Sequence, residues 1–558
     1  MKTVYRIYPA IGVARIGNSE TEYFLGPESP GVPPEGPYRD TSSPGKIKPQ
    51  AVRFRIYKFI RDDFGKEALD SEVIPDEKTK ITWSVHLVNR KAAGGSFPPG
   101  GPSSSPRNAE YDRAGLIVDA SLRSISGKNQ EAVPLSGEIN FIKNGDLEGS
   151  AKIALGRLLT DDEGRLIVVG GPGKSASPIG RGLNNFANND GWYDGVSDGP
   201  VTAVVEVEGE APNNAEGGAW VVVAPPSYAP GIENVTTWHD QAVNVAARNF
   251  SPVHIKDVPS FTRDIYPILK RVVMIHWVVE QRNRHHGGAG NFLNPERLSK
   301  LADKTESGKS ARETVLTWLT KPNTRVDPNT PPRSAPPSMP KVNSGLDPDN
   351  PERGEYTALT EYQYIMMEKW ARGDFHADWT GEPAPVSFNE LPLGQQPDAL
   401  TRAALEGCIG APFFPGIEVT YVIAQAATYE SPFRIKHTLP PGFLTERMAI
   451  PWQADFLACG ELWWPAQRPV DVVTAAGEIQ PFSRGINSIQ LLNDGKRWWI
   501  QLDGIDDQLI GSSGGIRFRA MILQQRIDQR RFASTGLPHK QNTQWQIRQC
   551  FAFLVRPG

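Results

Sequence analysis

Short stretches in which apolar and polar residues alternate dominate the first part of the chain, up to residue 225. The segments AVRFRIYKFI (51–60), TWSVHLV (82–88), TAVVEVE (202–208) and AWVVVAP (219–225) show this pattern between turns rich in Gly, Pro and Asn. A period of two places successive side chains on opposite faces of a strand. The chain is therefore expected to begin with antiparallel sheet that exposes one face to solvent.

Helical spacing of apolar residues first occurs near residue 260. The segment SFTRDIYPILKRVVMIHWVVEQR has Ser260 as its expected cap, and Pro267 inside it predicts an early turn or a kink. A later segment, ALTRAALEGC, predicts a helix that is capped by Asp398 and ends on Cys408.

A third helix is predicted in TEYQYIMMEKWARG, where Thr360 and Gln363 have the spacing of a capping box. The preceding stretch, 321–356, is rich in Pro, Asn and Ser and predicts a long loop of the kind that forms lids or interface arms. The middle of the chain is therefore expected to be mainly helical.

The chain has 558 residues, more than one core usually supports, so two or three packed subdomains are expected. We predict a strand-rich domain over 1–255, a mainly helical region over 256–410 and a mixed, loop-rich region over 411–558. The 53 Gly and 49 Pro residues argue against a helical bundle. The predicted fold class is α+β.

Charge and hydropathy exclude two classes of partner. The net charge of -3 gives no electrostatic footprint for nucleic acid. The longest uncharged apolar run near the middle of the chain, Val272 to Val279, is too short to span a bilayer. The N-terminus lacks the features of a secretory signal. We expect a cytoplasmic protein, or one exported without a standard signal peptide.

Three motifs resemble known ligand sites but fail on detail. GGPGKS (170–175) lacks the first glycine of a phosphate loop, since that position is Val168, and it is expected to be a glycine-rich turn. His285 and His286 are adjacent, so they do not face one point as a metal pair would. NNDGWYDGVSD (188–198) lacks the spacing of a calcium loop and predicts Asx turns. No metal site is predicted.

One of the three cysteines lies in a dense motif, PWQADFLACGELWWPAQRP (451–469). If a helix starts at Pro451, Asp455 and Cys459 lie on one face, one turn apart. A carboxylate so placed disfavours the thiolate that a nucleophilic cysteine needs. The pair is better suited to a sulfur that becomes covalently bonded while the carboxylate accepts a proton.

The same motif resembles the signature of the LodA-like family of quinoproteins, which includes L-lysine ε-oxidases and glycine oxidases. Other segments resemble that family in the same order along the chain: YPAIGVARIGNSETEYFLGPESPG, NNDGWYDGVSDGPV, AWVVVAPPSYAP, FTRDIYPILKRV, LTEYQYIMMEKWARG, CIGAPFFPGIEVTY and LPPGFLTERMAIPWQADF. The resemblance runs from near residue 1 to beyond residue 500.

The resemblance implies a protein-derived cofactor, cysteine tryptophylquinone, in which a thioether cross-link joins a Cys to an oxygenated Trp. It assigns the cysteine to Cys459 and proton handling to Asp455. The tryptophan is assigned to Trp499, with Leu502 at the matching offset, and Trp498 is the alternative. The separation from Cys459 is shorter than in larger family members, and Asp-Gly follows the leucine. The cofactor would lie in region 411–558.

The implied activity is oxidative deamination of a primary amine or amino acid through a Schiff base with the quinone, which acts as an electron sink. The products would be an aldehyde or oxo acid, ammonia and hydrogen peroxide, with oxygen as acceptor. The resemblance also implies a flavoprotein modifying enzyme as maturation partner and a homo-oligomer. A catalytically inactive family member that acts in binding or assembly is the alternative.

Three further residues are candidates for the substrate pocket. Cys408 ends the predicted helix shortly before the turn-rich segment APFFPGIE, His239 lies in VTTWHD, and His539 is a weaker candidate of the same kind. Each also has a structural alternative, a buried apolar filler for Cys408 and a hydrogen-bonded structural histidine for the others. The identity of the substrate is not predictable, because it depends on pocket shape and a few polar contacts.

Overall fold

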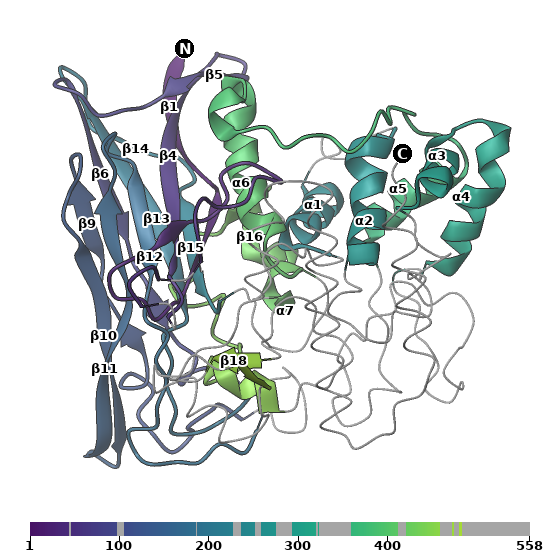
Figure 1. Ribbon diagram of the computed structural model, residues 1–558. Helices are drawn as coiled ribbons and strands as arrows, with labels where there is room; N and C mark the ends of the chain where they lie inside the picture. Colours follow the sequence, from purple (N-terminus) through teal and green to yellow (C-terminus); the bar gives the residue numbers. More distant parts are fainter. Residues whose placement is uncertain are drawn as a thin grey trace, which may run out of the picture.

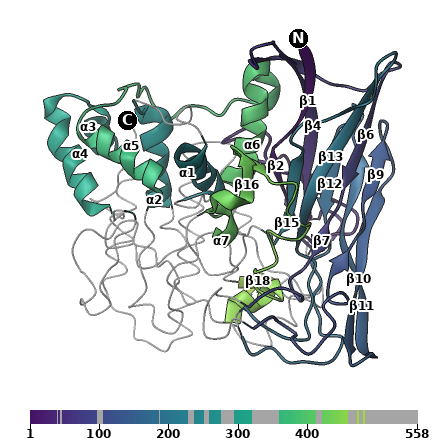
Figure 2. The same ribbon diagram turned by 180° about the vertical axis from the view of Figure 1, so that it is seen from behind.

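The computed structural model describes residues 1–38, 40–43, 46–96, 105–185, 187–226, 236–250, 258–274, 293–319, 322, 359–410, 420–457, 471–473 and 479–481. Figures 1 and 2 show that the strands of the large sheet form one side of the molecule, and that most of the helices lie on the other side. The two arrangements meet at helix α6, which runs along the sheet.

A large, curved sheet is formed by strands from the first 224 residues. The path of hydrogen-bonded neighbours is β10-β11-β12-β4-β2-β15-β13-β6-β9, and the shorter strands join its sides. Its ends approach one another, since β9 also contacts β10 and β11, so the sheet curls toward a barrel. Its strands are β1 (Lys2–Tyr8), β2 (Ile11–Arg15), β3 (Phe24–Leu25), β4 (Gln50–Arg61), β5 (Glu67–Glu72), β6 (Thr79–Val85), β7 (Val88–Asn89), β8 (Val118–Asp119), β9 (Arg123–Ser126), β10 (Val133–Lys143), β11 (Asp146–Thr160), β12 (Leu166–Gly170), β13 (Ser197–Val207), β14 (Asn213–Asn214) and β15 (Ala219–Ala224).

The strand-rich N-terminal part predicted from the sequence is confirmed, but several strands differ from the expected pattern. β12 is buried along its whole length, and β3 pairs with β4 in parallel. β2 and β15 pair in parallel, with Ile11 opposite Trp220 and Val13 opposite Val222. Every residue of both strands is buried. The expectation of one solvated face is therefore wrong for this pair, because strands covered on both faces carry continuous apolar runs such as AWVVVA.

The helices follow in the middle of the chain. They are α1 (Trp238–Asn249), a π-helical turn (Phe261–Ile265) that continues into α2 (Tyr266–Met274), α3 (Pro295–Ala302), α4 (Glu306–Trp318), α5 (Glu361–Ala371), α6 (Gln396–Glu406) and α7 (Thr420–Ile423). The buried guanidinium of Arg271 ties α2 to α1 through Asp240 (2.8 Å) and to α6 through Glu406 (3.5 Å). No helix in the described part of the chain has the length and apolarity needed to cross a bilayer.

Two of the three predicted caps are confirmed. The Ser260 side chain accepts a hydrogen bond from the backbone N–H of Arg263, and Thr360 and Gln363 form a capping box. The cap at Asp398 is wrong, because α6 already begins at Gln396. Pro397 is tolerated in the first turn, where no intrahelical N–H bond is lost, so the helix starts earlier.

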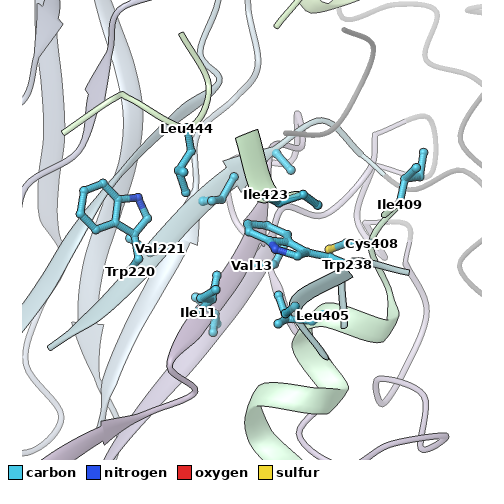
Figure 3. Close-up of a cluster of buried hydrophobic side chains, with 14 of the residues drawn as sticks. Ile11, Val13, Trp220, Val221, Trp238, Leu405, Cys408, Ile409, Ile423 and Leu444 are labelled. Atoms are coloured by element: carbon cyan, nitrogen blue, oxygen red, sulfur yellow. The ribbon is translucent and has the colours of Figure 1, made fainter. Parts of the chain in front are cut away.

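One continuous apolar core joins the sheet to the helices. Figure 3 shows part of it, where Val13 from the sheet, Leu405 from α6 and Ile423 from α7 lie around Trp238. These residues come from all three regions that the sequence predicts, and each region contributes side chains that are almost completely buried. The boundaries near 255 and 410 stay predictions.

The last described elements are short. Two-stranded pairings join β16 (Tyr429–Ser431) to β17 (Arg434–Ile435) and β18 (Asp471–Val473) to β19 (Ile479–Pro481). Between them lies a 3-10 helix, Trp452–Leu457, that contains Asp455. The candidate site is built around this helix.

Candidate active site

The start of the PWQADF motif is embedded in the protein interior. Trp452, Gln453 and Ala454 are fully buried, and a 3-10 helix begins at Trp452. The sequence predicts an α-helix from Pro451, so the observed helix differs in type. A 3-10 helix has three residues per turn, so residues four apart do not align on one face. The alignment of Asp455 with Cys459 therefore does not follow from this helix.

A fully buried ion pair meets the first residue of this helix. The Nζ atom of Lys91 donates to Oδ2 of Asp194, and neither side chain is exposed. The same carboxylate oxygen accepts the backbone N–H of Trp452 at 2.8 Å. The other oxygen, Oδ1, accepts from the backbone N–H of Val196 at 3.0 Å and from Nδ2 of Asn89 at 3.1 Å. The carboxylate thus caps the helix that contains Asp455.

Arg107 extends this polar cluster toward the segment before the helix. Its Nη1 atom donates to the carbonyl oxygens of Lys91 and Glu446, each at 3.2 Å. Its Nε atom donates to Oδ1 of Asn188 at 2.9 Å. Burial lowers the pKa of Arg107 to about 10, so the guanidinium remains protonated near neutral pH. The cluster therefore joins the sheet to the chain around residue 446.

The glycine-rich GGPGKS turn contacts the same motif. The indole Nε1 of Trp452 donates to the carbonyl oxygen of Gly173 at 3.1 Å, and Oγ of Ser175 donates to Oε1 of Gln453 at 3.0 Å. The described residues after it, 176–185, contain no helix, so the helix that follows a phosphate loop is not found there. This turn supports the PWQADF segment from the side of the sheet.

A second buried carboxylate holds the chain ahead of the helix. Oδ1 of Asp198 accepts from the backbone N–H and the hydroxyl of Thr445, at 2.8 and 2.6 Å. Oδ2 accepts from Nε1 of Trp220 at 2.9 Å and from the backbone N–H of Leu444 at 3.2 Å. Burial, opposed by these hydrogen bonds, raises the pKa of Asp198 to about 6.

The NNDGWYDGVSD segment was expected to form Asx turns, and the bond from Val196 N–H to Asp194 is one. Two of its carboxylates, Asp194 and Asp198, also reach across to the segment 444–452. Sequence reasoning missed this role. The signal that was available is the density of Asp and Asn in a segment beside a strand of apolar residues.

Cys408 is buried just after α6, as Figure 3 shows, and the predicted helix end at Cys408 is wrong because α6 ends at Glu406. The guanidinium of Arg15 donates to its Sγ atom at 3.5 Å, and to the carbonyl oxygens of Gly407 (3.1 Å) and Pro225 (2.8 Å). The backbone N–H of Trp238 donates to the carbonyl oxygen of Cys408 at 3.0 Å. These contacts fix the residue that leads into APFFPGIE, and they agree with a structural role for it.

His239 is brought near the same place. A β-bridge between Thr237 and Ile409 holds the segments that carry His239 and Cys408 side by side. The imidazole of His239 stacks on the ring of Phe433, with ring centroids 5.6 Å apart and an interplanar angle of 22°. Phe433 has a φ of 61°, an unusual backbone conformation for an aromatic residue. The pocket role of both candidates stays a prediction.

Four predicted site residues, Cys459, Trp498, Trp499 and His539, lie outside the described residues, as do His285 and His286. For Asp455 the structure describes the backbone only. Among the described residues no group of His, Cys, Asp and Glu side chains has the arrangement of a metal site. What the structure adds is the anchoring of the motif that contains Asp455.

Comparisons with known proteins agree with the family resemblance. Residues 8–223 match the family profile described as L-lysine epsilon oxidase N-terminal, and residues 341–475 match the L-lysine epsilon oxidase C-terminal domain. The chain is 30% identical over 533 residues to L-lysine 6-oxidase from Marinomonas mediterranea, and this match covers 81% of this chain and 70% of that protein.

Solved structures from the same organism share the fold. The structure of its epsilon-lysine oxidase matches with a TM-score of 0.68 and 25% identity, over 92% of this chain and 98% of that chain. The crystal structure of the Schiff base intermediate of its L-Lys epsilon-oxidase with L-Lys matches with a TM-score of 0.66 and 24% identity, over 88% and 91% of the two chains.

Proposed function

The chain belongs to the L-lysine ε-oxidase (LodA-like) family, and on that premise we propose that it oxidatively deaminates a primary amine or amino acid with a self-derived cysteine tryptophylquinone. The observation that carries this proposal is the 30% identity to L-lysine 6-oxidase, together with the intact PWQADFLAC motif. Cys459 and Trp499 would form the cross-link, with Trp498 as the alternative.

The described residues fit a cofactor at this place in the fold. Trp452, Gln453 and Ala454 enter the interior fully buried, and hydrogen bonds to Asp194, Gly173 and Ser175 hold them there. Cys459 follows the last residue of the 3-10 helix by two positions in the sequence. A reactive carbonyl needs a site from which water is excluded, and the burial of these three residues supports such a site beside the motif.

The quinone, once formed, supplies an electrophilic carbonyl and an electron sink for substrate oxidation. Asp455 is the proposed base, which takes the proton from the carbon that bears the substrate nitrogen. For this role its carboxyl group must be unprotonated in the free enzyme and close to that carbon. In this proposal the 3-10 helix, whose first residues are hydrogen-bonded to the rest of the protein, supports the backbone at Asp455.

Several finer points are proposals that rest on the family resemblance. They are the products (an aldehyde or oxo acid, ammonia and hydrogen peroxide), oxygen as acceptor, a flavoprotein modifying enzyme, a homo-oligomer, and a cytoplasmic location or export without a standard signal. The α+β class and the division into 1–255, 256–410 and 411–558 also stay proposals. Cys408, His239 and His539 are proposed pocket residues.

The test is the intact mass of the protein after coexpression with a family flavoprotein modifying enzyme. We expect the mass change of two added oxygens with loss of hydrogens, and a quinone redox stain that disappears in Cys459→Ala. Cys550→Ala, outside the motif, is the matched control and should keep both signals. An unmodified mass in the wild type would overturn the proposal.

Substrate class is then tested by peroxide release with a panel of primary amines, including lysine and glycine. Release that depends on Cys459 identifies the substrate. A protein without cross-link that releases no peroxide with any amine would favour the alternative, an inactive family member that acts in binding or assembly.

A further inference from the structure

Asp194 is placed to control the helix that contains the proposed base. Its Oδ2 atom accepts the backbone N–H of Trp452 at 2.8 Å, and this is the first residue of the 3-10 helix. Trp452 precedes Asp455 by three residues, which is one turn of such a helix. We propose that Asp194, paired with Lys91, is a positioning residue that sets the place of Asp455 and of the chain that leads to Cys459. This inference rests on the proposed function.

The positioning group is itself held rigidly by the sheet. Asn89, in β7, donates from Nδ2 to both the carbonyl oxygen and Oδ1 of Asp194, at 2.8 and 3.1 Å. The Oδ1 atom of Asn89 accepts the backbone N–H of Lys91 at 2.9 Å. One residue of this short strand therefore holds both the carboxylate of Asp194 and the backbone of Lys91. A rotation of the carboxylate would break bonds on both sides of it.

The cost of the ion pair argues for a role in geometry. Lys91 and Asp194 are both completely buried, and the cost of moving two charges out of water offsets most of the energy that their attraction provides. Apolar residues of similar size would stabilise the core at least as well. What apolar residues lack is an acceptor for the N–H of Trp452. The ion pair supplies that acceptor, and the ammonium of Lys91 balances its charge.

Asp194→Asn is the central variant, because it conserves shape. Both carboxylate oxygens accept from N–H groups, that of Trp452 on one side and those of Val196 and Asn89 on the other. An amide has one oxygen, so its NH2 group must face donors on one side. Either orientation disturbs the cluster without creating a cavity.

Two more variants complete the design. The double variant Lys91→Met/Asp194→Asn removes both charges, so no uncompensated charge stays buried and the protein should fold even if the single variant does not. Lys143→Met is the matched control, because Lys143 forms an exposed ion pair with Glu110 at 2.6 Å in the same sheet.

Three measurements test the inference, all on the full chain matured with a family flavoprotein. Hydrogen exchange of the peptide that covers 452–457 should become faster in both variants that carry Asp194→Asn and stay unchanged in Lys143→Met. The fraction of molecules with the cross-linked mass should fall. In the cross-linked fraction, kcat should fall on the order of 10- to 100-fold while KM changes by less than about threefold.

The outcomes separate this inference from the proposed function. Wild-type protein without the cross-link would overturn the proposed function and this inference with it. A cross-linked wild type, together with folded variants that show unchanged exchange at 452–457 and unchanged kcat, would overturn the inference alone. Activity loss that only follows the loss of folded protein would also overturn it, because a positioning residue changes kcat per cross-linked molecule.

Discussion

At the residue scale, Arg15 is a buried cation that joins three parts of the chain. Its guanidinium donates to Pro225 and Gly407 carbonyl oxygens and to Sγ of Cys408. Arg15→Lys keeps the charge but loses the planar arrangement of donors, so these acceptors cannot all be reached. We expect the free energy of unfolding to fall by about 1.5–3 kcal/mol, measured by urea denaturation. Arg123→Lys, at an exposed residue of β9, is the control and should have little effect on the free energy of unfolding. Equal decreases in both variants would contradict this interpretation.

Asp198 gives the chain a pH-dependent stability. Burial raises its pKa from 3.8 to about 6 in the folded protein, so between these values the folded state holds the proton more tightly than the unfolded state. The contribution of Asp198 to the free energy of unfolding therefore falls as pH rises from about 4 to 6. The total decrease is on the order of 3 kcal/mol, and it is complete above pH 6, where the buried carboxyl group is ionised.

Asp198→Asn removes this titration. The free energy of unfolding of the variant, relative to that of the wild type, should consequently increase with pH between about 4 and 7. Any further change that the substitution makes to this free energy is a constant amount that does not depend on pH. Chemical denaturation of both proteins across that range measures the difference. A difference that is constant with pH would show that the carboxyl group titrates normally in the folded state.

Local interactions were predictable at this scale and distant ones were not. The caps at Ser260 and Thr360 depend on partners three residues away, so the sequence shows both members. Lys91 and Asp194 are 103 positions apart. No pattern along the chain identifies two such residues as a pair, since only the folded sheet brings them together.

At the scale of elements, the segment that follows α6 is held unusually close to the start of α1. The backbone N–H of Gly410 donates to the carbonyl oxygen of Thr236 at 2.9 Å. A Cβ atom at Gly410 would collide with the carbonyl group of Thr237, which is backbone and cannot rotate away. Only glycine fits this approach.

Gly410→Ala should therefore push apart the segments that carry Cys408 and His239. We expect a loss of about 1–3 kcal/mol in unfolding free energy, measured by urea denaturation. Gly394→Ala is the control, because nothing lies within 4 Å of the added methyl group, and it should change stability by less than about 0.5 kcal/mol. Equal stability of the two variants would show that the backbone around residue 410 adjusts freely.

The types of the elements were predictable where the pattern is strong. Strands such as β6 and β13 alternate over most of their length as expected, whereas β2, β12 and β15 are buried on both faces. The helix at Trp452–Leu457 is 3-10 in type instead of α, and contacts with the sheet and with the GGPGKS segment hold its first residues. No pattern in the sequence indicates these tertiary contacts.

At the scale of the molecule, the motif that contains Asp455 and Cys459 was recognisable from the sequence, but the residues that anchor it were not. Asp455 and Cys459 lie within a few residues of each other, so a family signature contains both. The groups that anchor the motif, such as Lys91, Ser175 and Asp194, come from separate turns of the N-terminal half. They are ordinary polar residues in the sequence, and their burial is visible only once the sheet is formed.

The continuity of the core makes a prediction about folding. Val13, Leu405 and Ile423 pack in one cluster although they belong to the sheet, to α6 and to α7. Leu405 is completely buried between the sheet and the helices. If each region folded alone, the apolar faces that meet there would be exposed to water. We therefore expect the sheet and the helices of the described part to unfold in a single transition.

Leu405→Ala tests this expectation. Loss of the buried side chain should lower the free energy of unfolding by about 2–5 kcal/mol. In hydrogen exchange, peptides from β13 and from α1 should lose protection by the same amount. Leu393→Ala, at a residue that is 37% exposed, should change neither. A loss confined to the helices, or two separate transitions in urea, would mean that the sheet is stable by itself. The three predicted regions would then be independent domains, and the anchoring of the Asp455 motif on the sheet would have to depend on docking between them.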